Sequence, residues 1–302
     1  MIFDEFWTLE EARNYSTGEI FQKLSDLGIT LKAEEFLQQI QSCYGTSDLK
    51  QQWKSLYEIS AQGRDKDFVS LGALVLWERL APDCFSSDQL YVAIEEGLDD
   101  LEAGENRKVC DLWLECWAKL KERFIPMGLS FAEVDKKFNG CLYAVSDWLL
   151  DIPTELDKLG KEEPIYFQKE IDYCRDFLAT FPDADDRAVL QLTMLEAMTL
   201  FSLEKVEEGD HCFENLVKRY PGKDFLYTIW GGVHWKAAFC PPSRVDLDKA
   251  EQIYRMGLTN LGDDYKMLLP DLKAVDKERL KAKKKSRAET KQKGKGKKST
   301  RK

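Results

Sequence analysis

Small and aromatic residues recur at fixed spacing in the second half of this 302-residue chain, and this spacing constrains the fold more than any other feature. Ala197 and Gly209 are small, Phe213 follows four residues after Gly209, and Pro221 stands eight residues further on. Small residues on two antiparallel helices let their backbones approach closely, while the aromatic residue fills the seam to the next pair. Proline then stops the second helix, because it cannot continue one.

The set recurs once more along the chain, with Gly231, Ala250, Tyr254 and Gly257 at the corresponding places. Gly209 and Ala250 are 41 residues apart, which is a 34-residue repeat plus a seven-residue insertion in the stretch AAFCPPSRVD. A partial third copy stands upstream in CRDFLATFPDADD. This is the spacing of the tetratricopeptide repeat, whose hairpins must stack because none buries its apolar face alone. The prediction is an all-α protein, with an α-solenoid of tetratricopeptide-like helical hairpins.

The rest of the chain also carries helix signals, and convincing strand alternation is absent from its sequence. Ser16 and Ser86 each open a capping box, with Glu19 and Gln89 three residues later. The stretch FVSLGALVLWERLAP is apolar nearly all round, which predicts a deeply buried helix. We expect about fourteen helices in three regions: an N-terminal helical region (1–150), tetratricopeptide-like repeats (151–265), and a charged helix with a disordered Lys-rich tail (266–302).

The chain resembles an uncharacterised family of bacterial tetratricopeptide-like proteins, some of which end in a SEC-C zinc module. The similar stretches are YSTGEIFQKLSDLGITLKAEEF, LGALVLWERLAPD, DLWLECW, CRDFLATFPD and LVKRYPGKDFLYTIWGGVHW with KAEQIYRMGL. They cover roughly residues 8–262. The resemblance implies no reaction. The zinc module needs closely spaced Cys and His, and neither residue occurs after Cys240, so the module is absent here.

The residues that could carry chemistry favour a structural interpretation. The eight cysteines form no CxxC pair, which suits reduced, mostly buried thiols in a cytoplasmic protein. His211 and Cys212 are adjacent on a predicted helix and point about 100° apart, so they cannot easily hold one metal. His234 falls where the hairpin interior is expected. The sequence therefore predicts no catalytic residue, no metal site and no cofactor, and an enzyme with an unrecognised site is the third hypothesis.

A partner-binding groove is the leading functional prediction. In tetratricopeptide folds, certain positions of the first helix of each hairpin line a concave surface. The residues at those positions here are Thr228, Trp235, Lys236, Met194 and Met198. An aromatic ring, a cation and flexible Met side chains suit the binding of a protein or peptide partner. The alternative is that the C-terminal helix packs over these residues and buries them.

The charge distribution supports a second hypothesis. Residues 281–302 carry a net charge of +11, and the other 280 residues carry −21. Such a tail can neutralise phosphates, which gives salt-sensitive, sequence-blind contact with RNA or DNA. The candidate residues are Lys283, Lys284, Lys285, Arg287, Lys297 and Lys298. The alternatives are that the tail only aids solubility or folds back on the acidic body. We expect no membrane contact, since no apolar run approaches the roughly 20 residues that span a bilayer.

Overall fold

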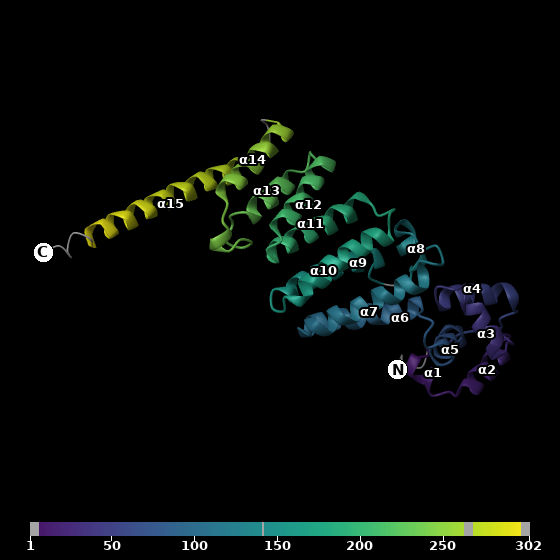
Figure 1. The fold of residues 1–302 in the computed structure, drawn as a ribbon. Coiled ribbons are helices and arrows are strands. Elements are labelled where there is room, and N and C mark those ends of the chain that lie inside the picture. The colour runs from purple at the N-terminus through teal and green to yellow at the C-terminus, as the bar shows by residue number, and fades with distance from the viewer. Residues whose placement is uncertain (1–5, 141, 263–267, 297–302) are drawn as a thin grey trace. The chain divides into compact units, whose positions relative to one another are not determined.

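The computed structural model describes residues 6–140, 142–262 and 268–296; most of these residues form helices, and there is no strand among them (Figure 1). The prediction of an all-α protein is therefore confirmed over this part of the chain. The chain divides into two compact units. The first comprises Met1–Leu159 and Asp176–Asp185, and the second comprises Gly160–Arg175 and Asp186–Lys302.

The first unit is built around a central apolar helix. Its helices are α1 (Leu9–Arg13), α2 (Thr17–Asp26), α3 (Ala33–Ile40), α4 (Thr46–Leu56), α5 (Asp65–Leu80), α6 (Ser87–Ala103), α7 (Asn106–Phe124), η1 (Phe131–Glu133), α8 (Val134–Lys137) and α9 (Val145–Gly160). Helix α5 packs against α1, α2, α3 and α4. Phe68, Val75 and Trp77 of α5 are fully buried, as the apolar run predicted.

Both capping boxes predicted from the sequence are present. Ser16 accepts a hydrogen bond from the Glu19 amide, and the Glu19 carboxylate accepts one from the Ser16 amide, which starts α2. Ser86 and Gln89 make the same pair of bonds at the start of α6. These bonds satisfy amide groups that have no partner within the helix.

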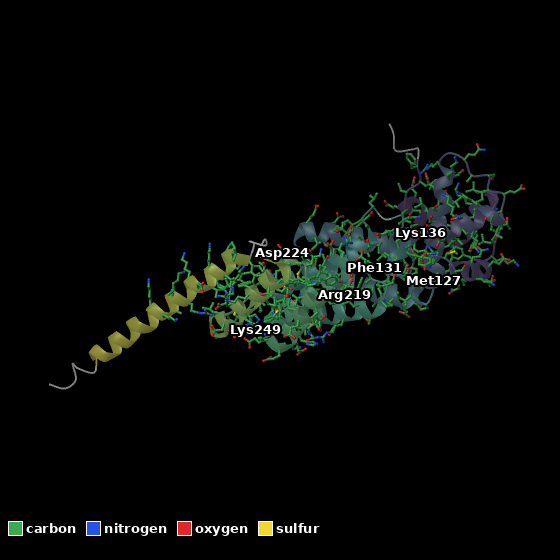
Figure 2. The ribbon with its side chains drawn as sticks, turned by 90° about the horizontal axis from the view of Figure 1, so that it is seen from above. Met127, Phe131, Lys136, Arg219, Asp224 and Lys249 are labelled. Carbon is green, nitrogen blue, oxygen red and sulfur yellow. The ribbon has the colours of Figure 1, made fainter. Side chains whose placement is uncertain are left out.

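Aromatic rings fill the later part of the first unit. Phe131, labelled in Figure 2, lies edge-on to Phe177, with ring centroids 5.5 Å apart. Trp117 stacks on Phe177 at 5.8 Å, and its indole N–H donates to Asp176 over 2.7 Å. Buried rings with satisfied polar atoms give this part of the core much of its apolar contact area.

The second unit contains the two hairpins with the full predicted repeat pattern, whereas residues 151–159 and most of the partial copy CRDFLATFPDADD belong to the first unit. The helices of the second unit are α10 (Ile165–Thr180, whose last residues belong to the first unit), α11 (Asp186–Ser202), α12 (Val206–Arg219), α13 (Asp224–Val233), η2 (Pro242–Arg244), α14 (Leu247–Leu261) and α15 (Leu269–Gly296). Helix α11 packs on α12, and α13 packs on α14, so the two segments with the full repeat pattern are helical hairpins. Helix α15 packs on α14.

The expected disordered tail differs from the structure. Residues 281–296, which composition predicted to be disordered, continue α15 as a helix. Lys, Arg, Ala, Glu and Gln are all good helix formers, so a helix already started by buried contacts upstream can propagate through them. Lys297 and Lys298 lie outside the described residues.

Candidate functional site

Small residues bring the helices of the first hairpin together as predicted. A Cβ on Gly209 of α12 would lie 2.6 Å from the Phe201 ring and 3.1 Å from the Ala197 carbonyl oxygen, both on α11. Only glycine fits this approach. Phe213, one turn further along α12, stacks on Trp230 of α13 at 6.1 Å. The aromatic residue thus fills the seam to the next hairpin, where the repeat pattern placed it.

Trp235 and Lys236 lie differently from the prediction, which placed them on the first helix of the second hairpin. Helix α13 ends at Val233, and both residues stand in the turn after it. Part of the physical reason is local. Gly231 and Gly232 are poor helix formers, and the amides of Trp235 and Lys236 both return to the Gly232 carbonyl.

Long-range hydrogen bonds fix this early helix end. The amide of Asp246 donates to the His234 carbonyl oxygen over 2.8 Å, which ties the following loop back to the turn. Arg244 in the same loop donates to the carbonyl oxygen of Phe201 on α11. The loop that the repeat spacing identified as an insertion is therefore anchored to both hairpins.

The polar groups of Trp235 and Lys236 have partners inside the second unit. The Trp235 indole N–H donates to the Tyr254 hydroxyl over 2.9 Å. The Lys236 ammonium pairs with Asp271 of α15 at 2.9 Å. Both side chains are partly buried. The contact with α15 corresponds to the alternative in which the C-terminal helix packs over this region.

The remaining predicted groove residues lie on two helices. Three of them are partly buried and pack against the core cluster of the second unit: Met194 and Met198 of α11, and Trp235. Thr228 of α13 is also partly buried. These side chains therefore contribute to packing as well as to the surface.

A polar cluster that sequence reasoning missed joins three parts of the repeats. The Asp210 carboxylate of α12 accepts hydrogen bonds from the Trp230 indole at 2.6 Å and interacts with the His234 ring at 2.9 Å. Lys249 of α14 lies 3.3 Å from the same carboxylate. Burial disfavours ionisation of Asp210, but the bonds from His234 and Trp230 outweigh it and keep its pKa below the ordinary value. His234 is 5% exposed, so this cluster is a buried structural link.

The other histidine and two of the described thiols have the following surroundings. His211 is bonded to Asn215 at 3.2 Å, one turn along α12. Burial raises the pKa of Cys212 to about 11 and that of Cys116 to about 12, which keeps both thiols protonated at neutral pH. Among the described residues, seven cysteines are free, and no three His, Cys, Asp or Glu side chains converge as metal ligands would. Cys141 lies outside this set.

An open groove lies on the repeats, between α12 and α14. Its volume is about 420 Å³, and its lining residues are Glu214, Val217, Lys218, Pro221, Trp230, Met256 and Asn260. Met256 supplies partly exposed apolar surface here, and Val217 and Trp230 lie buried beneath it. Glu214 and Lys218, one turn apart on α12, stand in the lining without an ion pair to each other or to another described residue. Trp230 of α13 is almost fully buried beneath this groove.

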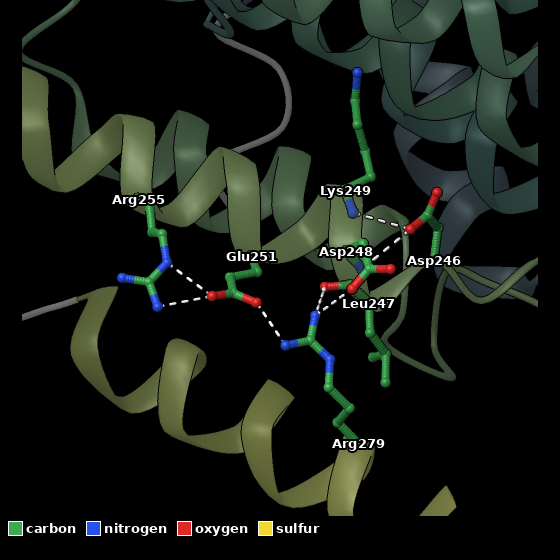
Figure 3. A network of polar contacts seen from close by, with 7 residues as sticks. All are labelled: Asp246, Leu247, Asp248, Lys249, Glu251, Arg255 and Arg279. Atoms are coloured by element: carbon green, nitrogen blue, oxygen red, sulfur yellow. Dashed lines mark hydrogen bonds and ion pairs between the residues drawn. The ribbon is translucent and has the colours of Figure 1, made fainter. Parts of the chain in front are cut away.

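Helix α15 is fastened to α14 by a network of ion pairs (Figure 3). Arg279 of α15 contacts Glu251 at 2.6 Å and Asp248 at 2.5 Å, and Arg255 pairs with Glu251 at 2.7 Å. Asp246 caps α14 by accepting from the amide of Lys249, and Lys249 is also labelled in Figure 2. Leu268 and Val275 add fully buried apolar contact.

Beyond this contact, α15 carries the basic residues of the second hypothesis. Lys281 pairs with Glu278 at 2.5 Å, and Lys283 and Lys284 are exposed. Lys285 and Arg287 lie on the helical part of the same segment. The basic segment therefore begins directly after the part of α15 that packs on α14.

Comparison with known proteins identified no relative: no family model, curated protein or solved structure matched the chain. The resemblance to bacterial tetratricopeptide-like proteins accordingly stays a prediction. Within the described residues, none of the helices combines the length and the apolar character needed to cross a lipid bilayer.

Proposed function

We propose that the protein is a non-enzymatic, cytoplasmic scaffold that binds a protein or peptide partner through its helical repeats. The observation that carries this proposal is the groove between α12 and α14, with Met256 as its accessible apolar side chain above buried Val217 and Trp230. The hairpins beneath it are fixed by glycine–aromatic contacts, so the groove is preformed. A preformed apolar groove between helices is a usual means of holding an amphipathic segment.

The groove indicates the chemistry of the partner. Glu214 and Lys218 offer one anionic and one cationic contact on the same helix. A segment with an apolar anchor for the Met256 region and a charge of each sign near it complements this surface. The region around Trp235 is the less suitable alternative, because the Trp235 N–H and the Lys236 ammonium already have intramolecular partners.

The test begins with random peptides displayed on phage and selected against the full-length protein. Enriched peptides are then measured by fluorescence polarisation against wild type and Met256→Glu, which places a charge among the apolar groove residues. We expect the substitution to weaken binding at least about tenfold, since burying an unpaired charge against an apolar anchor is costly. Thr259→Glu is the matched control, because Thr259 is exposed on the same helix and does not line the groove.

Two outcomes count against the proposal. One is that no peptide is enriched over repeated rounds of selection. The other is that the enriched peptides bind wild type, Met256→Glu and Thr259→Glu equally well. Thermal unfolding of each variant separates lost binding from lost folding.

A second candidate function rests on α15. Its exposed Lys283 and Lys284 begin a basic segment that continues the helix past the Arg279 contacts. A helical display of like charges favours phosphate backbones, and the segment contains no aromatic residue for base stacking. We propose non-specific contact with RNA or DNA, for instance at the ribosome, as the alternative activity.

A further inference from the structure

A pocket in the first unit, far along the chain from the groove, is lined by three lysines. Its volume is about 390 Å³, and its lining residues are Lys50, Lys54, Ile59, Ala61, Lys66 and Val69. Lys50 and Lys54 lie one turn apart on the same face of α4. Lys66 comes from the first turn of α5, and Ile59 and Ala61 come from the segment between the two helices. The local folding of α4 and α5 thus gathers three cations around one cavity.

The three ammonium groups have no carboxylate partner among the described residues. The Lys50 ammonium donates to the Lys66 backbone carbonyl over 3.3 Å, which holds it at the pocket but leaves its charge uncompensated. Two of the acids close to these lysines in the sequence are engaged elsewhere: Asp65 pairs with Lys23 at 3.0 Å, and Asp48 accepts from the Tyr44 amide. A concentration of positive charge is unusual in a body whose net charge is −21 without its C-terminal segment.

The apolar part of the pocket adds a second requirement. Val69 is buried, and Ile59 and Ala61 pack against the core of the first unit. A bare inorganic anion would leave the partly exposed Ile59 and Ala61 facing water. The volume falls within the range of about 300–1,000 Å³ that small-molecule sites occupy.

We propose that this pocket binds a small organic phosphate, with the phosphate between the three lysines and the apolar body against Ile59 and Ala61. A phosphate monoester carries about −1.5 to −2 charges at neutral pH, so it neutralises most of the cluster, whereas one carboxylate leaves most of it uncompensated. Lysine holds phosphate as a point charge and needs no fixed hydrogen-bond geometry. The site is separate from the proposed peptide groove and does not depend on it.

Isothermal titration of the full-length protein tests the proposal with phenyl phosphate, inorganic phosphate, benzoate and phenol. We expect phenyl phosphate to bind most tightly, inorganic phosphate and benzoate more weakly, and phenol not at all. Lys54→Gln/Lys66→Gln should weaken phenyl phosphate binding about tenfold, because each exposed ion pair contributes a fraction of a kcal/mol to about 1 kcal/mol. Lys54→Arg should retain binding, since it keeps the charge.

Two controls separate this site from general charge and from misfolding. Lys32→Gln/Lys136→Gln removes the same charge from exposed positions of the first unit outside the pocket and should bind like wild type. Ala61→Leu keeps all three lysines but fills the apolar side, and it should weaken phenyl phosphate more than inorganic phosphate. Each variant is checked by its thermal unfolding midpoint.

The proposal is overturned if phenyl phosphate shows no saturable binding up to about 10 mM, which corresponds to less than about 3 kcal/mol of binding free energy. Equal losses in the two double variants would also overturn it, because binding would then follow net charge alone. If inorganic phosphate binds as tightly as phenyl phosphate, the site does not recognise an organic body and the proposed ligand class is wrong.

Discussion

The ring of Tyr254 lies against the backbone of Gly231, so closely that a Cβ on Gly231 would come within 2.3 Å of the ring. Tyr254 belongs to α14 and Gly231 to α13, and both are fully or almost fully buried. The contact holds the second hairpin together, and the Tyr254 hydroxyl also accepts the hydrogen bond from Trp235. One glycine thus permits both the helix packing and the position of the turn beyond it.

Gly231→Ala is expected to destabilise the protein despite alanine's better helix propensity. Overpacking a core commonly costs about 1–3 kcal/mol, whereas the propensity gain returns at most about 1 kcal/mol. Gly18→Ala is the matched control, because a Cβ on Gly18 in α2 meets nothing within 4 Å. Urea unfolding monitored by circular dichroism measures both free energies. A Gly231→Ala protein as stable as Gly18→Ala would contradict the close packing.

Helix α15 is expected to act as a cap on the repeats, and two truncations measure this. Removing residues 264–302 takes away buried Leu268 and Val275, each of which contributes roughly 1.5–3 kcal/mol of apolar burial. Removing residues 281–302 leaves these contacts and Arg279 in place. We therefore expect a clearly lower thermal midpoint for the longer truncation and an unchanged one for the shorter. Equal midpoints would show that α15 does not stabilise the hairpins.

The buried interactions of the Asp210 carboxylate predict that the free energy of unfolding falls at acid pH. Its pKa in the folded state is lowered from the ordinary 3.8, so its stabilising contribution is complete above that value and is lost as the pH falls through the folded-state pKa. Asp210→Asn removes the charge but keeps a hydrogen-bond acceptor. The loss of unfolding free energy that it causes, about 1–3 kcal/mol at pH 7, should shrink towards pH 3.

Denaturant unfolding of both proteins at several pH values measures this difference directly. Other carboxylates, such as Glu251 and Asp186, also have lowered pKa values and affect both proteins alike. The difference between wild type and Asp210→Asn therefore isolates Asp210. A difference that stays constant from pH 7 to pH 3 would show that the charge on Asp210 does not stabilise the fold.

The sequence predicted the contacts that depend on residue spacing along one hairpin. Gly209 and Phe213 are fixed by contacts with the neighbouring helix, so their types and spacing are visible in the chain. The end of α13 could not be predicted in this way, because the amide of Asp246, in a later loop, bonds to the His234 carbonyl oxygen and so holds the turn that contains Trp235. The Asp210 cluster was missed for the same reason: its partners come from different helices at separations that follow no repeat.

The alternative function predicts salt-sensitive binding to a homopolymeric RNA that depends on residues 281–302. The full-length protein should bind polyuridylate with an affinity that falls steeply with salt, since the logarithm of the binding constant falls by about 0.7 per neutralised phosphate for each tenfold rise in salt. The truncated protein, which lacks a net charge of +11, should lose both the binding and the slope. A variant with residues 281–302 in shuffled order should bind like wild type, because charge rather than sequence carries the contact.

Peptide binding in the α12–α14 groove should be unaffected by the truncation. A truncated protein that keeps the wild-type salt slope would assign the RNA contact to another surface and remove the basis for a role of α15.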